Sequence, residues 1–211
     1  MSVSLDFRAL LVGPIETNCY IVWDTDTLAA AIIDPGEEQG LICSQVDSLD
    51  LKVEWVLLTH GHFDHSFLVG PIAEKYHARI GMQALDITQV ARSLEFGAQF
   101  CEVSSFVPFT PTDLLNDGDV IALGSSTIKV LHTPGHSQGG LCFVTEIGVF
   151  CGDLIFAGSV GRTDFPGGSH EQLLLSINTR ILTLDDSTKL FPGHGPVTTV
   201  GEERRGNWYL Q

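Results

Sequence analysis

Seven histidine and aspartate side chains fall in short, glycine-containing segments, and their types are those that bind transition-metal cations. Four of them lie in the run Thr59-His60-Gly61-His62-Phe63-Asp64-His65. The other three lie in Thr133-Pro134-Gly135-His136, in Gly152-Asp153 and in Pro192-Gly193-His194-Gly195. Imidazole nitrogen and carboxylate oxygen are ligands that Zn²⁺ and similar cations take in proteins. An isolated loop histidine is more often solvated or packed, but the whole set predicts a metal site.

The spacing within the first run predicts two cations. In an extended segment His60 and His62 can point to one side, whereas the adjacent residues Asp64 and His65 point differently. A carboxylate such as Asp153 can bridge two cations. Seven ligands with one shared leave coordination open for a bridging water, whose pKa falls toward neutrality beside a metal. A second cation can polarise a carbonyl, so the expected chemistry is hydrolysis of an acyl bond.

Each of these segments follows a predicted strand, and loops at the ends of rigid strands are where sites usually lie. Residues 53–58 form a short apolar run, which predicts a buried strand immediately before His60. The other predicted strands are 18–23 and 28–33, joined as a hairpin, then 119–123, 127–131, 141–145, 147–151 and 188–191. The predicted helices are 37–48, 71–77 with Pro71 at the first position, and 170–184 with Ser169 as N-cap and Gln172 completing a capping box. Residues 84–115 carry no interpretable motif.

The order of these elements predicts an α/β fold. Two successive groups of strands and helices favour two sheets packed face to face with helices outside. Hydrophobic residues make up 44% of the 211 residues, which is enough for a sizeable core. No low-complexity linker interrupts the chain, so we expect one domain over residues 1–211.

Charge and cysteine content restrict the partners and the compartment. The net charge of −15 disfavours nucleic acid and anionic membranes as partners, because both carry negative charge themselves. We find no apolar run of membrane-spanning length and no secretory signal at the N-terminus. The five cysteines are odd in number and include no C-x-x-C pair, which favours a reducing, cytoplasmic location and buried packing.

The four segments together resemble the metallo-β-lactamase superfamily. The H-x-H-x-D-H run, T-P-G-H, G-D and G-H-G occur in the family's order across residues 59–195. Within the superfamily the chain is most similar to glyoxalase II, hydroxyacylglutathione hydrolase, in its short bacterial form. The runs that carry this likeness are Gly152–Phe156, Gly158–Pro166, Thr17–Tyr20 and Asp34-Pro35-Gly36. The last of these could support the ligand residues or simply form a turn, and we favour the turn.

The resemblance implies an αββα sandwich of two mixed sheets and a binuclear hydrolase. By resemblance, His60, His62 and His136 would bind the first metal, while Asp64, His65 and His194 would bind the second. Asp153 would bridge the two metals, and Asp64 would also orient the attacking hydroxide. The cofactors would be two divalent ions, zinc first, with iron or manganese as alternatives. The substrate would be S-lactoylglutathione or a related small acyl thioester.

The chain departs from full-length glyoxalase II in one respect, because the C-terminal helical domain that binds glutathione has no counterpart before Gln211. Arg162 lies where the family has a basic residue near glutathione, so it could bind a substrate carboxylate or pair with Asp164. The alternative activity is that of a persulfide dioxygenase, whose single iron needs two histidines and an aspartate. A β-lactamase, a nuclease and a non-enzymatic metal-binding module are less favoured.

Overall fold

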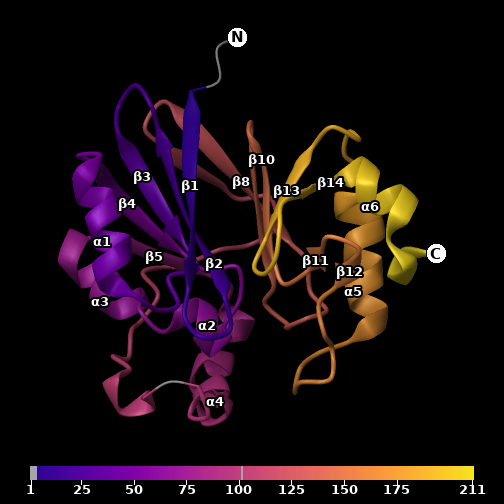
Figure 1. Ribbon diagram of the computed structural model, residues 1–211, viewed down its shortest axis with the longest axis horizontal. Helices are drawn as coiled ribbons and strands as arrows, with labels where there is room; N and C mark the ends of the chain where they lie inside the picture. Colours follow the sequence, from indigo (N-terminus) through magenta and orange to yellow (C-terminus); the bar gives the residue numbers. More distant parts are fainter. Residues whose placement is uncertain (1–3, 101) are drawn as a thin grey trace.

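Two six-stranded sheets pack face to face, and helices cover their outer faces (Figure 1). This computed structural model describes residues 4–100 and 102–211. The first sheet has the order β1-β2-β3-β4-β5-β6. Its strands are β1 (Leu5–Val12), β2 (Thr17–Asp24), β3 (Ala29–Ile33), β4 (Lys52–Leu57), β5 (Arg79–Met82) and β6 (Asp113–Leu114).

The second sheet has the order β14-β13-β10-β9-β8-β7, and a two-stranded ribbon of β11 and β12 lies apart from it. The strands are β7 (Val120–Leu123), β8 (Ser126–His132), β9 (Leu141–Thr145), β10 (Gly148–Gly152), β11 (Ile155–Phe156), β12 (Ser159–Val160), β13 (Lys189–Pro192) and β14 (Thr198–Thr199). Both sheets are mixed, since β3 to β6 pair in parallel in the first and β10 pairs in parallel with β13 in the second. The predicted α/β sandwich with mixed sheets is therefore confirmed.

Helices α1 and α3 cover the first sheet, and α5 and α6 cover the second (Figure 1). The helices are α1 (Gln39–Ser48), α2 (Phe63–Ser66), α3 (Val69–Tyr76), α4 (Ile87–Gly97), α5 (His170–Ser176) and α6 (Val200–Gly206). Short helical turns are η1 (Ala84–Asp86), η2 (Val103–Ser105), η3 (Ile177–Ile181) and η4 (Trp208–Leu210). Within the described residues, no helix has both the length and the apolar character needed to cross a membrane.

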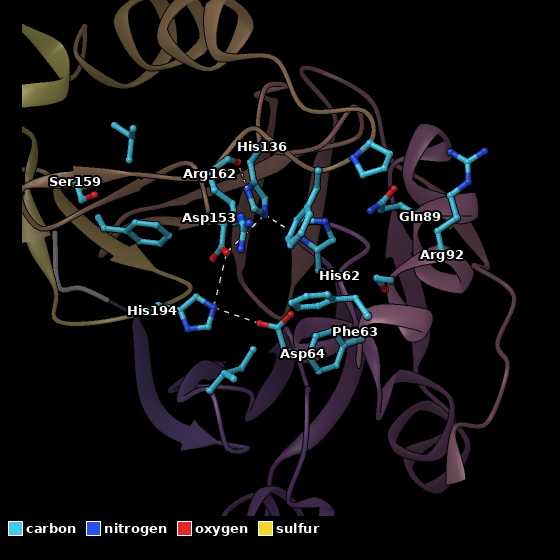
Figure 2. Close-up of a pocket in the computed structure, with 17 residues that line it drawn as sticks. His62, Phe63, Asp64, Gln89, Arg92, His136, Asp153, Ser159, Arg162 and His194 are labelled. Atoms are coloured by element: carbon cyan, nitrogen blue, oxygen red, sulfur yellow. Dashed lines mark hydrogen bonds and ion pairs between the residues drawn. The ribbon is translucent and has the colours of Figure 1, made fainter. Parts of the chain in front are cut away.

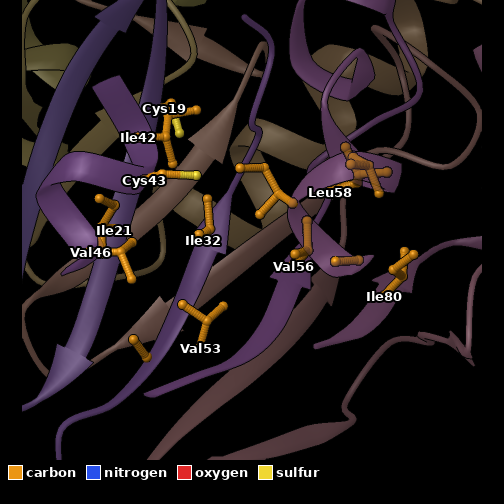
Figure 3. Close-up of a cluster of buried hydrophobic side chains, with 14 of the residues drawn as sticks. Cys19, Ile21, Ile32, Ile42, Cys43, Val46, Val53, Val56, Leu58 and Ile80 are labelled. Carbon is orange, nitrogen blue, oxygen red and sulfur yellow. The ribbon is translucent and has the colours of Figure 1, made fainter. Parts of the chain in front are cut away.

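Three apolar clusters hold these layers together. The first packs α1 and α3 on the first sheet, where Ile42 and Val46 of α1 contact the cluster around Ile32 (Figure 3). The second fills the space between the sheets, and Phe150 stacks on Phe191 at 4.7 Å between ring centroids. The third packs α5 and α6 against the second sheet. Because β2 and β3 are covered on both faces, all of their residues are buried and their sequences do not alternate.

Most predicted elements are present, with small shifts. The hairpin of β2 and β3 and the strand before His60 are confirmed. Pro71 is the third residue of α3 rather than the first, and the strand β1 was not predicted. The Ser169 hydroxyl accepts a hydrogen bond from the Gln172 amide at 3.3 Å, which confirms the N-cap. The predicted 170–184 helix instead changes to a π-helical turn after Ser176.

The described cysteines are buried and unpaired, as expected for packing residues. They are Cys19, Cys43, Cys142 and Cys151. Burial raises the pKa of the Cys142 thiol to about 12, so this side chain remains a neutral thiol at neutral pH. Cys101 lies outside the described residues.

Candidate metal centre

The four sequence segments meet at one end of the sandwich, where strands of both sheets terminate (Figure 2). β4 ends at Leu57 just before His60 and His62, and α2 carries Asp64 and His65 on its single turn. His136, Asp153 and His194 follow β8, β10 and β13 in the second sheet. The structure thus brings together all seven side chains that the sequence singled out as metal-type residues.

One group consists of three imidazoles. Ligand atoms of His60, His62 and His136 all lie within 4.8 Å of one another, and the three residues are buried. Nδ1 of His62 and Nε2 of His136 are only 2.8 Å apart. Three imidazole nitrogens that converge in this way form a donor set typical of a Zn²⁺ site with an open position.

A second group combines a carboxylate with two imidazoles. Oδ2 of Asp64 lies 3.1 Å from Nε2 of His65 and 3.2 Å from Nε2 of His194. Ligand atoms of these residues lie within 4.8 Å of one another. This group is therefore also able to hold a cation.

Asp153 lies between the two groups. Its Oδ1 is 3.5 Å from Nε2 of His65 in the second group. Its Oδ2 is 3.6 Å from Nε2 of His136 in the first group and 3.7 Å from Nε2 of His194. The two oxygens of one carboxylate thus face both groups, which is the arrangement that a bridging ligand requires.

Four of the histidines are oriented by hydrogen bonds at Nδ1, the ring nitrogen that faces away from the cluster. Nδ1 of His136 donates to the Arg162 carbonyl at 2.7 Å, and Nδ1 of His194 lies 3.2 Å from the Glu16 carbonyl. Because a carbonyl can only accept, both rings carry their proton on Nδ1 and leave Nε2 free to face the cluster. The distribution of protons therefore suits metal binding at these two residues.

Asp34 orients the other two, His60 and His65. Its Oδ2 accepts from Nδ1 of His65 at 2.9 Å and from the Thr59 hydroxyl at 2.6 Å. Since the Thr59 hydroxyl gives its one proton to Asp34, it accepts from Nδ1 of His60 at 3.0 Å. The interpretation of Asp34-Pro35-Gly36 as mainly a turn was wrong, because the buried Asp34 carboxylate supports two ligand-type residues.

Sequence reasoning also missed Asp86, which joins two of the ligand loops. This buried side chain accepts from the Gly61 amide at 2.9 Å and from the Gly139 amide at 2.6 Å. Gly61 separates His60 from His62, and Gly139 follows His136 by three positions. Asp86 lies in the segment without an interpretable motif, and its only sequence signal is an acidic residue just before a helix.

The first two residues of β2, Thr17 and Asn18, support Asp64 and the turn that carries His194. The Thr17 hydroxyl donates to Oδ2 of Asp64 at 3.0 Å. The Asn18 amide donates to the carbonyls of Pro192 and Gly195, at 3.0 and 2.9 Å, and so fixes the turn that carries His194. The resemblance had marked residues 17–20, but only the fold reveals why they matter.

The electrostatics of the two groups differ. Burial lowers the pKa of His62 to about 3 and that of His60 well below its usual range, so both are neutral at pH 7. Burial also opposes charge on His65, but the carboxylates of Asp64, Asp153 and Asp34 outweigh it and raise its pKa. For Asp64, burial is outweighed by His65 and His194, and the pKa falls. Burial thus keeps His60 and His62 of the first group neutral, whereas in the second group carboxylates outweigh burial and raise the pKa of both His65 and His194.

The cluster contains polar atoms that no protein group satisfies, although buried polar atoms are nearly always paired. Among the described residues, Nε2 of His60, Nε2 of His65 and Oδ1 of Asp153 are buried without a hydrogen-bond partner. Gly193 lies against this cluster so closely that an added Cβ would meet Oδ1 of Asp153 at 2.2 Å. Unsatisfied lone pairs that converge in a fixed cradle fit bound cations.

The comparison with known proteins places the chain in a family. The model of the metallo-β-lactamase superfamily matches residues 12–194. The chain belongs to the metallo-β-lactamase superfamily. It is 34% identical over 209 residues to hydroxyacylglutathione hydrolase GloC of Haemophilus influenzae, and the match covers 98% of each chain.

Solved structures of similar proteins share this fold. The crystal structure of the BLEG-1 B3 metallo-β-lactamase superposes with a TM-score of 0.89 at 32% identity, covering 97% of this chain and 99% of that one. A crystal structure of TTHA1623 in a di-iron-bound form gives a TM-score of 0.83 at 33% identity, covering 96% and 100%. Both likenesses extend over the whole sandwich that carries the metal-type cluster.

Arg162 pairs with Asp164 and packs on Phe165. Its guanidinium donates to both carboxylate oxygens of Asp164 at 2.7 Å and lies 3.9 Å from the centre of the Phe165 ring. Its side chain lines the cavity over the cluster, and its carbonyl orients His136. Of the remaining histidines, His170 lies in the first turn of α5 as predicted, and Nε2 of His132 contacts the Gln138 carbonyl at 2.9 Å.

Proposed function

We propose that this protein is a binuclear metal-dependent hydrolase of the glyoxalase II type, which cleaves acyl thioesters such as S-lactoylglutathione. The observation that carries the proposal is the position of Asp153, whose two oxygens face two separate ligand groups. The similarity to hydroxyacylglutathione hydrolase GloC supports the choice of thioester. We propose His60, His62 and His136 as ligands of one metal, Asp64, His65 and His194 as ligands of the other, and Asp153 as the bridge.

Two divalent cations, which we propose to be zinc, would supply a water of lowered pKa and positive charge to stabilise the developing oxyanion. Iron is the main alternative, given the di-iron form of one related structure. In the overall reaction the water oxygen adds to the acyl carbon, the carbon–sulfur bond breaks, and the thiol leaves with a proton. The products are a carboxylic acid and a free thiol.

The chain's own residues prepare this reaction in two ways. The Thr17 hydroxyl donates to Oδ2 of Asp64 and so fixes this carboxylate in one orientation beside the proposed nucleophile. Asp34 and the Arg162 and Glu16 carbonyls hold the imidazole protons on the far side of their rings. These contacts keep the ligand lone pairs directed inward without any rearrangement at the time of reaction.

The proposal is tested with purified protein loaded with zinc, iron or manganese and assayed for thiol release from S-lactoylglutathione. We expect two metal ions per chain and turnover that a chelator abolishes. His136→Ala should lose activity while its circular dichroism remains that of the wild type. A fully loaded protein that hydrolyses no thioester would refute the proposed function.

The same assay separates the alternatives. One iron per chain with oxygen uptake on a persulfide would indicate the dioxygenase, although His65 and His194 would then have no ligand role. Hydrolysis of a chromogenic β-lactam at a rate above that of any thioester would indicate a lactamase, the activity named for one related structure.

A further inference from the structure

The cavity over the cluster is far larger than a lactoyl group. It has a volume of about 430 Å³, and His62, Asp64, His136, Asp153 and His194 form its base. Much of its wall is apolar, and this part includes Ile15, Phe63, Phe96, Phe156, Val160 and Phe165. A site that binds only small polar acyl groups has no need of such a wall, since apolar surface left in water favours apolar ligands.

Aromatic rings flank the cluster on two sides that belong to different elements. On one side the Phe165 ring lies 5.5 Å from the His62 ring and 5.3 Å from the Phe96 ring of α4. On the other side the Phe156 ring of β11 lies 6.2 Å from the His194 ring. A thioester whose carbonyl lies over the cluster can therefore extend one arm toward α4 and the other toward β11 and β12. Figure 2 shows Arg92 and Ser159 at these opposite sides.

Among the described residues, the arginines that line the cavity are Arg92 and Arg162, and Arg92 lies on α4 (Figure 2). Arg162 lies over Phe165, and its Nε and Nη2 atoms already donate to the two carboxylate oxygens of Asp164. Arg92 is exposed and lies one helical turn before Phe96, on the same face of α4. Among the described residues no carboxylate forms an ion pair with Arg92, whereas the other arginines bind an aspartate or, for Arg8, Gln45. In a chain with 26 acidic residues, this free guanidinium suits an acidic ligand.

The β11 side contains no lysine or arginine among the cavity residues that the structure describes. Phe156 pairs with Ser159 across the ribbon, and Val160 and Ile15 complete this side. The ribbon is fixed from behind, because the buried Glu203 accepts from the Gly158 amide at 2.9 Å. This side is therefore a preformed apolar pocket rather than a loop that closes on any ligand.

Given the proposed thioester hydrolysis, on which this inference rests, we infer that the substrate lies across the cluster in one direction. Its acyl group is apolar and larger than lactoyl, and it packs against Phe156 and Val160. Its carrier thiol bears a carboxylate, which binds Arg92 at the α4 side. The substrate class is thus an acidic thiol esterified with an aryl or branched-alkyl acid, and Phe156 and Arg92 determine specificity.

The test uses four thioesters that combine two acyl groups with two thiols. The acyl groups are acetyl and phenylacetyl, and the thiols are glutathione, which is acidic, and pantetheine, which is neutral. For the wild type we expect phenylacetyl thioesters to exceed acetyl thioesters about tenfold in kcat/KM with either thiol. We expect glutathione esters to have a KM roughly fivefold below that of pantetheine esters.

Two substitutions then assign the two sides. Phe156→Ala should remove most of the acyl preference and leave the thiol preference intact, and Arg92→Gln should do the reverse. Arg92→Lys should retain part of the thiol preference because it keeps the charge. Phe109→Ala and Arg8→Gln, which replace residues outside the cavity, serve as matched controls and should keep both preferences.

The outcomes separate this inference from the proposed function. Exchanged effects, in which Phe156→Ala alters the thiol preference, would overturn the direction of binding. Equal rates on all four esters would overturn the substrate class while leaving the thioesterase intact. No hydrolysis of any ester by the loaded wild type would refute the proposed function itself, and with it the inference.

Discussion

Substitution of Asp86 tests how far zinc affinity depends on residues that position the proposed ligands rather than on the ligands themselves. Asp86 is 1% exposed, and its two oxygens accept from the amides of Gly61 and Gly139. Asp86→Ala would leave two buried N–H groups without acceptors. At about 1–3 kcal/mol for each unsatisfied group, the free energy of unfolding should fall by roughly 2–6 kcal/mol.

Asp86→Asn is the finer probe, because it keeps the shape of the side chain. The amide oxygen can accept from one backbone N–H, while the amide NH₂ opposes the other. We expect about half the destabilisation of the alanine variant. Since the Gly61 and Gly139 loops carry His60, His62 and His136, zinc affinity should fall roughly 10–100-fold, as for other residues that orient ligands.

The assays are urea unfolding of the metal-free protein and zinc titration in competition with a chromogenic chelator. Asp47→Ala is the control, because Asp47 lies on the surface and pairs with Lys75 far from the cluster. Its zinc affinity should equal that of the wild type. Wild-type zinc affinity in Asp86→Asn would refute the reasoning, since the two loops would then hold their geometry without the carboxylate.

Three further predictions concern other contacts of the fold. Hydrogen bonds from Ser125, together with those from Thr27 and Ser126, hold the pKa of Asp24 below its ordinary value, so its stabilising effect is present above about pH 4 and is lost as the pH falls through the folded-state pKa. Asp24→Asn should therefore destabilise the protein at pH 7 but less below about pH 4 in acid-to-neutral denaturation series, and a constant difference across this range would contradict the assignment. Gly36→Ala would place a Cβ 1.7 Å from the Asp64 carbonyl oxygen, so we expect displacement of α2 and loss of metal binding. As the control, Gly40→Ala in α1 has open space and should be neutral or stabilising. Equal zinc affinity in both variants would argue against this steric constraint. Ser169→Ala removes the N-cap of α5 and should lower the free energy of unfolding, measured in urea, by about 1 kcal/mol. Ser169→Asp keeps a capping oxygen and should preserve the stability of the wild type. An equal loss in the two variants would mean that the cap does not act through its oxygen.

The sequence by itself determined the type of fold and the members of the candidate site. Apolar runs such as 53–58 indicate buried strands, and the glycine-containing turns after them mark where polar residues leave the sheets. Ligand chemistry depends on side-chain type, and His60, His62, Asp64 and His65 stand close enough in the chain for their local geometry to be inferred. The glycine-containing turns after the later predicted strands then supplied His136, Asp153 and His194.

Only the tertiary structure decided which groups support these residues and what lies over them. Asp34 and Asp86 look like ordinary turn and helix-start residues, because hydrogen bonds to Thr59, His65, Gly61 and Gly139 join positions 25 or more residues apart. The cavity wall draws on Ile15, Phe96, Phe156 and Phe165, which share no local pattern. Local sequence encodes periodicity and ligand type, whereas contacts between distant segments depend on how two sheets and their loops pack in space.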